Sequence, residues 1–137
     1  MKENIYSRNA VYETMRANRR QAIRLLMAEN IQEKGHIPAI LELAKQHKVP
    51  LERVPRQRLD SLNPQHQGVV LEAGRYPYMD ISDILDNAKA KNEPLFVLLL
   101  DRLQDPQNFG TLLRTAEAVG IHGVILPLAH TVEVTPA

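Results

Sequence analysis

The chain contains no cysteine and no tryptophan, and only 4% of its 137 residues are aromatic. Without cysteine, disulfide scaffolds, zinc ribbons and thiol catalysis are excluded. Long hydrophobic runs are also missing: the longest, Leu95–Leu100, is far shorter than the roughly 20 residues that cross a bilayer. No apolar stretch follows the charged N-terminus, so no signal peptide is expected. These absences predict a protein that lies in the reducing cytoplasm and is not associated with a membrane.

Two kinds of ligand site lack their usual sequence patterns. The chain has no Gly-x-Gly-x-x-Gly and no phosphate-loop motif, so the common nucleotide-binding signatures are absent. Its histidines show no metal-ligand spacing, and no metal is expected; they are His36, His47, His66, His122 and His130.

The net charge of +1 is the difference between two unlike halves. Residues 1–58 hold 12 basic and 6 acidic side chains, whereas residues 59–137 hold 5 basic and 10 acidic ones. A basic half suits a surface that binds nucleic acid, because phosphate contacts dominate the affinity of such surfaces. A merely solvated charged surface is the alternative that charge alone leaves open.

Apolar spacing along the chain predicts an α/β fold. Helices are expected over residues 8–17, 37–46 and 81–91, with a helical turn over 57–62. Strands are expected over residues 22–28, 51–54, 68–73, 95–100 and 122–126. The continuous apolar run 95–100 is typical of a parallel strand covered on both faces. Turn-forming residues over 74–79 predict a linker between a domain at 1–73 and a second at 80–137.

The loop after residues 95–100 opens onto a helix, the place where open α/β sheets bind ligands. We predict that Asn108 caps this helix and that it ends at Gly120. Its apolar face is expected to comprise Leu112, Ala116 and Val119, and its opposite face Gly110, Arg114 and Glu117. Because glycine in a first turn costs about 1 kcal/mol relative to alanine, we expect a backbone or a substrate close to it. An ordinary surface helix with an Arg114–Glu117 ion pair is the alternative.

The pattern over residues 101–120 is Asp101-x-x-x-Asp105-Pro-x-Asn108-x-Gly110-x-x-x-Arg114-Thr-Ala-x-Ala-x-Gly120. It resembles the first motif of the SpoU-type RNA ribose 2′-O-methyltransferases, which belong to the SPOUT class of trefoil-knotted enzymes that use S-adenosyl-L-methionine (AdoMet). Upstream, residues 5–11 and 66–70 resemble the two ends of the substrate-binding domain in the ribosomal-RNA guanosine branch. That domain is similar to small α/β ribosomal proteins that bind kinked RNA. Ser7 stands where the branch commonly has glycine.

The resemblance implies a reaction and a set of residues for it. The 2′-hydroxyl of a ribose, here of a guanosine in ribosomal RNA, would attack the methyl group of AdoMet. Arg114 matches the catalytic arginine, Asn108 the asparagine that shapes the site, and Glu117 an acidic position one turn on. Because a guanidinium does not readily give up its proton, we expect Arg114 to hold a phosphate and stabilise the developing alkoxide rather than act as a simple base. The resemblance also implies a homodimer through the knotted domain.

RNA contacts are expected from the basic half of the chain. The expected contacts are Arg8, Asn9, Arg16, Arg19, Arg20, His66 and Gln67, and Arg24 lies beside the first arginine group. Arg53, Arg56 and Arg58 form a second arginine group, for which phosphate contact and a solvated charged surface are both left open. Ordinary helix capping is the alternative for Arg8 and Asn9, and ordering of a turn is the alternative for His66. Tyr76 and Tyr78 are expected to pack at the linker rather than stack on bases.

Two later SPOUT motifs, one bearing glycine and glutamate and one built around Ser-Leu-Asn, hold AdoMet in the resembling enzymes, and neither occurs before Ala137. We therefore expect no AdoMet-binding residue within these 137 residues, an incomplete knot and no methyltransferase activity from this polypeptide alone. Two other functions stay open. One is a non-catalytic RNA-binding protein, and the other is a SpoU-type enzyme that acts on transfer RNA.

Overall fold

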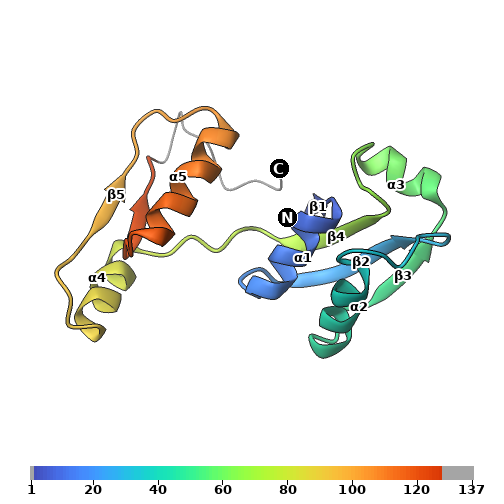
Figure 1. The fold of residues 1–137 in the computed structure, drawn as a ribbon, viewed down its shortest axis with the longest axis horizontal. Coiled ribbons are helices and arrows are strands. Elements are labelled where there is room, and N and C mark those ends of the chain that lie inside the picture. Colours follow the sequence, from blue (N-terminus) through green and yellow to red (C-terminus); the bar gives the residue numbers. More distant parts are fainter. Residues whose placement is uncertain (1, 128–137) are drawn as a thin grey trace. The chain divides into compact units, whose positions relative to one another are not determined.

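The computed structural model describes residues 2–127, which form two compact units that divide between Pro77 and Tyr78 (Figure 1). The division falls inside the turn-rich stretch 74–79. Each unit is a mixture of helices and strands, so the α/β prediction is confirmed. Residues 1–77 hold 13 basic and 8 acidic side chains, and residues 78–134 hold 4 and 8.

The first unit is built on a four-stranded sheet in the order β1-β4-β2-β3. Strand β1 (Lys2–Tyr6) runs antiparallel to β4 (Val69–Gly74), and β4 runs antiparallel to β2 (Ala22–Ala28). Strand β3 (Leu51–Val54) is parallel to β2. The sequence did not predict β1, because Ile5 is its one buried residue and no alternating pattern marks it. Its pairing with β4 makes it an edge strand.

Helices cover both faces of this sheet (Figure 1). Helix α1 (Arg8–Ala17) and helix α2 (Ile37–Gln46) pack on one face, where their apolar side chains meet those of β2 and β4; the buried set includes Val11, Met15, Ile37, Ile40, Leu25, Met27 and Leu71. Helix α3 (Arg56–Leu62) covers the other face, where Leu59 meets Leu26, Val54 and Val70. Alternation along β2 sends neighbouring residues to opposite faces, so this strand lies between two apolar layers.

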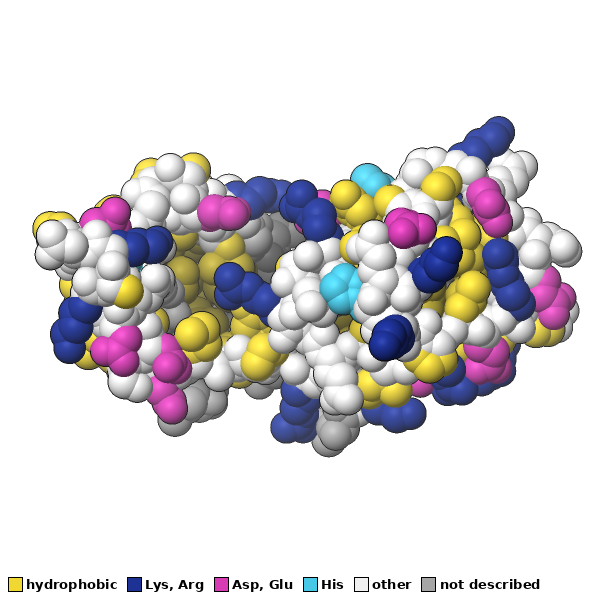
Figure 2. All heavy atoms as spheres, turned by 90° about the horizontal axis from the view of Figure 1, so that it is seen from below, with side chains coloured by type: hydrophobic (Ala, Val, Ile, Leu, Met, Phe, Trp, Pro, Cys, Tyr) yellow, Lys and Arg dark blue, Asp and Glu magenta, His cyan; other side chains and the backbone are white. Residues whose placement is uncertain are grey.

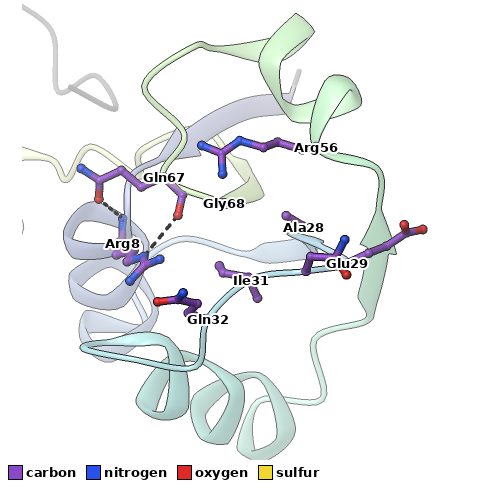
Figure 3. A pocket seen from close by; sticks show the side chains of 9 residues that line it. Arg8, Ala28, Glu29, Ile31, Gln32, Arg56, Gln67 and Gly68 are labelled. Atoms are coloured by element: carbon purple, nitrogen blue, oxygen red, sulfur yellow. Dashed lines mark hydrogen bonds between the residues drawn. The ribbon is translucent and has the colours of Figure 1, made fainter.

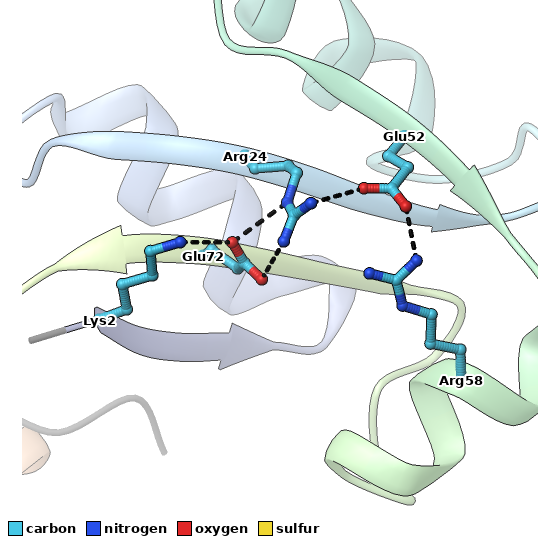
Figure 4. A network of polar contacts seen from close by, with 5 residues as sticks. All are labelled: Lys2, Arg24, Glu52, Arg58 and Glu72. Carbon is cyan, nitrogen blue, oxygen red and sulfur yellow. Dashed lines mark hydrogen bonds and ion pairs between the residues drawn. The ribbon is translucent and has the colours of Figure 1, made fainter.

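Beyond the part that α3 covers, the same sheet face is polar (Figure 4). Arg24 lies between two carboxylates, with its Nη2 2.8 Å from Glu72 Oε1 and its Nη1 2.8 Å from Glu52 Oε2. Lys2 reaches Glu72 at 3.6 Å, and Arg58 pairs with Glu52. The hydrogen bond from Arg24 is the main reason that the pKa of Glu72 lies below its usual value, and the same bond raises the pKa of Arg24.

The second unit contains a β-α-β arrangement, as predicted. Strands β5 (Val97–Leu99) and β6 (Gly123–Ile125) are parallel neighbours, joined by helix α5 (Pro106–Ala118). The core between them holds Leu100 and Phe109, with Leu98, Leu112, Leu113 and Val124 packed around. Helix α4 (Ile81–Ala90) precedes them, and its Ile84 packs so close to Gly123 that a Cβ there would lie 2.4 Å from Ile84 Cδ1.

Several expectations for this unit are wrong. Strand β5 has three residues, and Leu99 is 70% exposed, because the described elements cover only the side of the strand that carries Leu98 and Leu100. Helix α5 is capped by Asp105, whose carboxylate accepts from the Gln107 N–H at 2.9 Å, and not by Asn108. An aspartate cap followed by proline at the first helical position satisfies this helix start better than an asparagine three residues later.

Because α5 starts earlier than predicted, Gly110 lies at a different position within the helix and a different set of residues forms the apolar face. Gly110 lies in the second turn, and beyond its chain neighbours and the adjoining helix backbone no described atom lies within 4 Å of a Cβ built there, so the close neighbour that we expected is absent from the described residues. Val119 is the exposed C-cap residue, whereas Phe109 and Leu113 take part in the core.

Candidate nucleic-acid interface and candidate catalytic helix

The turn into α1 has a backbone conformation that suits glycine. Ser7 has φ 78° and ψ 148°, a region that side chains rarely adopt, and its Oγ accepts from the Ala10 N–H at 3.4 Å. The glycine expected at this position from the SpoU resemblance thus has a physical reason. Ser7 compensates for the backbone strain by capping the helix.

The two segments that carried the upstream resemblance lie side by side. The Arg8 backbone N–H donates to Gln67 Oε1 at 3.2 Å, and the Arg8 Nε–H donates to the Gln67 carbonyl at 3.2 Å. Arg8 Nη1 also donates to the Lys34 carbonyl at 3.4 Å. These acceptors are neutral, so they fix the guanidinium in place without cancelling its charge.

His66 orders the turn that presents Gln67. Its ring is fully buried; Nδ1 accepts from the Gly68 N–H at 2.7 Å, and Nε2 lies 2.9 Å from Asp60 Oδ1. With Nδ1 as the acceptor, the ring proton is on Nε2 and is donated to Asp60. Both ring nitrogens are used and the ring is covered, so the expectation of direct RNA contact by His66 is corrected to a structural role.

An open hollow of about 590 Å³ lies beside this turn (Figure 3). Arg8 and Gln67 line one side of it, Arg56 extends from the start of α3 on another, and Ile31 and Gln32 come from the segment after β2. The sequence grouped Arg56 with its neighbours Arg53 and Arg58, and no spacing linked it to Arg8. Only the sheet topology brings the two together.

The first arginine group is largely neutralised within the unit. Arg20 is 9% exposed; it pairs with Glu3, donates to the Gly74 carbonyl at 3.4 Å and lies 5.3 Å from the Tyr76 ring centroid. Direct RNA contact by Arg20 is therefore corrected to a packing role at the start of the linker. Arg24 belongs to the sheet-face network, and Arg16 pairs with Glu13 at 2.7 Å although it remains exposed.

The remaining basic side chains differ in how they are paired. Arg53 lies 3.5 Å from Glu33, and Arg58 pairs with Glu52, whereas within residues 2–127 no carboxylate pairs with the exposed Arg56. Asn9 and Arg19 are exposed. On the face seen in Figure 2, Lys and Arg side chains of the first unit alternate with Asp and Glu instead of forming one patch. Charge alone would not have located the hollow.

In the second unit, the predicted catalytic residues lie on exposed parts of α5. Arg114 and Glu117 are one turn apart on one face, and the described residues provide Arg114 with no ion pair, so the Arg114–Glu117 pair of the alternative interpretation does not form there. Instead, Arg114 Nη2 lies 3.5 Å from Thr111 Oγ1, a residue that the sequence reasoning missed. Asn108 is six residues earlier, about 120° away around the helix, so it does not share the Arg114 face.

The described residues do not enclose a cofactor in the second unit. The loop between β5 and α5 is open to solvent at Asp101, Arg102 and Gln104, and the sheet that it follows has two described strands. Among residues 2–127 no group of three His, Asp or Glu could hold a metal ion, and no described helix is long and apolar enough to span a membrane. His130 lies outside the described residues.

Comparison with known proteins gives this arrangement its class. A family described as "RNA 2'-O ribose methyltransferase substrate binding" matches residues 5–79, and the "SpoU rRNA Methylase family" matches residues 95–137. The two matches define a protein in which an RNA substrate-binding unit precedes a methylase unit. The chain belongs to the SpoU family of RNA methyltransferases, which confirms the resemblance at the level of the family.

The relatives are bacterial. The chain is 42% identical over 132 residues to the "Putative TrmH family tRNA/rRNA methyltransferase YacO" of Bacillus subtilis, and these residues make up 96% of this chain and 52% of that protein. A similarly named protein of Staphylococcus saprophyticus is 36% identical over 132 residues, with the same coverage. The chain thus spans about half the length of the curated relatives it matches.

A solved structure shares the fold. It is the SpoU methyltransferase AviRb from Streptomyces viridochromogenes, in complex with the cofactor AdoMet. The TM-score is 0.70 at 19% identity, over 98% of this chain and 48% of AviRb.

Proposed function

We propose that the protein to which these residues belong transfers a methyl group from AdoMet to the ribose 2′-hydroxyl of a guanosine in ribosomal RNA. The observation that carries the proposal is the order of the two family matches, an RNA substrate-binding unit and then a methylase unit. The exposed polar face of α5 supports it, because this face lies within the second match and Arg114 on it forms no ion pair with the described residues.

Arg114 would act on the RNA rather than as a simple base. A guanidinium offers several N–H donors in a plane and no acceptor, which suits a phosphate and the negative charge that develops on the ribose oxygen. Thr111 would hold this side chain on the exposed face through its hydroxyl. Glu117 would supply an acidic side chain one helical turn after Arg114, and Asn108 would shape the site from the first turn of α5.

RNA binding would fall to exposed side chains of the first unit. We propose Arg8, Asn9, Arg16, Arg19 and Gln67 for this role, because they remain accessible while Arg20 and His66 do not. Methylation would take place in the cytoplasm. A homodimer would form through a complete, knotted second unit, and the open surroundings of Gly110 leave room for the close approach of another backbone.

Transfer RNA is the second candidate substrate. The relatives from Bacillus and Staphylococcus carry names that include both tRNA and rRNA methyltransferase, and this observation favours neither RNA over the other. The family that matches residues 95–137 is described as an rRNA methylase family, and this is our reason to place ribosomal RNA first.

The test is methyl transfer by the full-length gene product. Ribosomal and transfer RNA from a strain that lacks the gene would be incubated with labelled AdoMet and digested to nucleosides. We expect label in 2′-O-methylguanosine from ribosomal RNA. The Arg114→Lys variant keeps the charge but loses the planar donor set, so we expect turnover to fall at least about 100-fold, the size of effect typical for loss of one transition-state donor. Wild-type turnover in this variant would contradict the assigned role, and label in transfer RNA alone would establish the second candidate.

A further inference from the structure

We propose that the hollow beside the His66–Gly68 turn holds one ribonucleotide of the RNA, with its phosphate between Arg8 and Arg56 and its base over Ile31. This inference rests on the proposed RNA-binding role of the first unit. It goes beyond that role because it assigns a particular site and the part of the RNA that the site takes. Neither family match assigns a ligand to any of these residues.

The charges around the hollow favour an anion. Arg8 donates only to carbonyl oxygens, and Arg56 has no carboxylate partner among the described residues, so two uncompensated positive charges flank the same space. Glu29 also lines the hollow, but its carboxylate extends away from both guanidinium groups (Figure 3). Arg8 Nη2 takes no part in the bonds that fix this side chain, so it is available to a phosphate oxygen.

The hollow is also lined by apolar and amide groups that the binding of a phosphate alone would not require. Ile31 supplies an apolar surface against which a base can lie, and Gln32 and Gln67 bring side-chain amides to the rim. The Arg8 N–H fixes Gln67 Oε1 as an acceptor, which turns the Gln67 amide nitrogen and its two donors toward other partners. Hydrogen bonds to base edges and stacking of unpaired bases are the usual means by which proteins recognise single-stranded RNA. A volume of about 590 Å³ lies within the range of about 300–1,000 Å³ typical of small-ligand sites.

The turn that closes the hollow is held in advance of binding. The buried His66 ring accepts from the Gly68 N–H and is itself tied to Asp60. Gly68 has φ 88°, and a Cβ there would lie 2.7 Å from Ile31 Cδ1, so Ile31 packs directly on the glycine. A wall that needs no ordering on binding leaves more of the interaction energy for affinity.

The test titrates the 137-residue protein with nucleoside 5′-monophosphates, with ribose 5-phosphate and with inorganic phosphate, each to about 10 mM. Amide ¹⁵N and ¹H shifts of Ile31, Gln67 and Gly68 report on the site. We expect at least one nucleotide to saturate these shifts and to bind at least about 10-fold more tightly than ribose 5-phosphate or phosphate. Equal binding of all three ligands would reduce the hollow to a phosphate site and overturn the proposal, as would the absence of any shift.

Two matched variants on α3 test the residue assignment. Arg56→Ala removes the unpaired arginine at the hollow, and we expect it to weaken nucleotide binding about 10-fold or more. Arg58→Ala removes an arginine of the same helix that pairs with Glu52, and we expect no change in nucleotide binding. Equal effects of the two substitutions would contradict the site.

Filter binding of ribosomal RNA separates this inference from the proposed function. RNA that binds the wild type and both variants equally, with no mononucleotide binding, would overturn the site while RNA binding by the first unit survives. Failure of the wild type to bind RNA at low salt would count against the proposed role of the first unit itself. Tighter RNA binding by wild type and Arg58→Ala than by Arg56→Ala is the expected result.

Discussion

The two units differ in how completely they bury their apolar side chains. In the first unit, side chains from β2, β4, α1 and α2 form a closed core in which Leu25, Leu71 and Ile40 are fully covered. In the second unit, apolar side chains remain exposed from α4 through β5 and α5, among them Ile81, Leu95, Phe96, Leu99 and Val119. Their charges also differ, since the first unit has an excess of basic residues and the second an excess of acidic ones.

The first unit is therefore stabilised by its own closed core, whereas the second unit leaves apolar side chains on its surface. The first unit closes both faces of its sheet near β2, and its polar sheet face is satisfied by the Arg24 network. The described part of the second unit has two strands and one apolar cluster around Leu100 and Phe109. Core substitutions should therefore be far more costly in the first unit than substitutions of the exposed apolar residues in the second.

The most destabilising substitution is expected in the closed core of the first unit. Leu25→Ala empties a fully buried position of the first unit and should lower the free energy of unfolding by about 2–5 kcal/mol. Leu99→Ala is the matched change in the second unit, where the side chain is 70% exposed, and it should alter stability by no more than about 0.5 kcal/mol. Urea unfolding followed by far-UV circular dichroism measures both. A Leu99→Ala loss as large as that of Leu25→Ala would show that the two units are equally dependent on burial.

Much of the fold could be predicted from the sequence because its helices and strands follow apolar spacing. Helices 8–17 and 37–46 and strands 22–28 and 51–54 are confirmed with their predicted bounds. Strand β1 was missed because its pairing partner, β4, lies more than 60 residues away, and only this pairing makes Lys2–Tyr6 a strand. The predicted start of α5 was wrong because two possible cap residues, Asp105 and Asn108, lie three positions apart. The aspartate, which proline follows, forms the cap.

Less of the candidate site could be predicted. Composition and resemblance pointed to the arginines, but they could not separate the paired from the unpaired ones. Arg20 and Arg56 both read as basic surface residues, yet Arg20 is buried against Glu3 while Arg56 lines the hollow. The partners of Arg20 and Arg24 are set by strand order, which local sequence does not encode. Thr111 was missed because its contact with Arg114 involves a side-chain rotamer rather than a motif.

Two glycines of the second unit differ in their surroundings, because Gly123 packs against Ile84 whereas Gly110 faces open space. Gly123→Ala would place a Cβ 2.4 Å from Ile84 Cδ1 and 2.9 Å from Ile84 Cγ2, so the packing of α4 must shift, at a cost of about 1–3 kcal/mol. Gly110→Ala meets no described atom within 4 Å and lies inside a helix, so it should stabilise the protein by up to about 1 kcal/mol. Thermal unfolding of the two variants should therefore shift in opposite directions. A loss of stability in Gly110→Ala would mean that another segment approaches α5 at this point.

The smallest expected effect concerns the polar face of the first unit's sheet, where the pKa of Glu72 is lowered mainly by its hydrogen bond from Arg24. A carboxyl whose pKa is lower in the folded than in the unfolded state stabilises the fold above the unfolded value, here 4.5, and this contribution is lost as the pH falls through the folded value. Glu72→Gln keeps the shape of the side chain but removes this titration. We expect the wild type to lose more stability than Glu72→Gln between about pH 6 and pH 3, measured by urea unfolding at each pH.

The control is Asp86→Asn in the second unit. Asp86 is an exposed carboxylate of α4 that lies 3.9 Å from Lys89, and its replacement should leave the pH dependence unchanged, because exposed ion pairs contribute little. Parallel pH profiles for the wild type and Glu72→Gln would show that the Arg24 network holds the sheet face by geometry alone and not by charge.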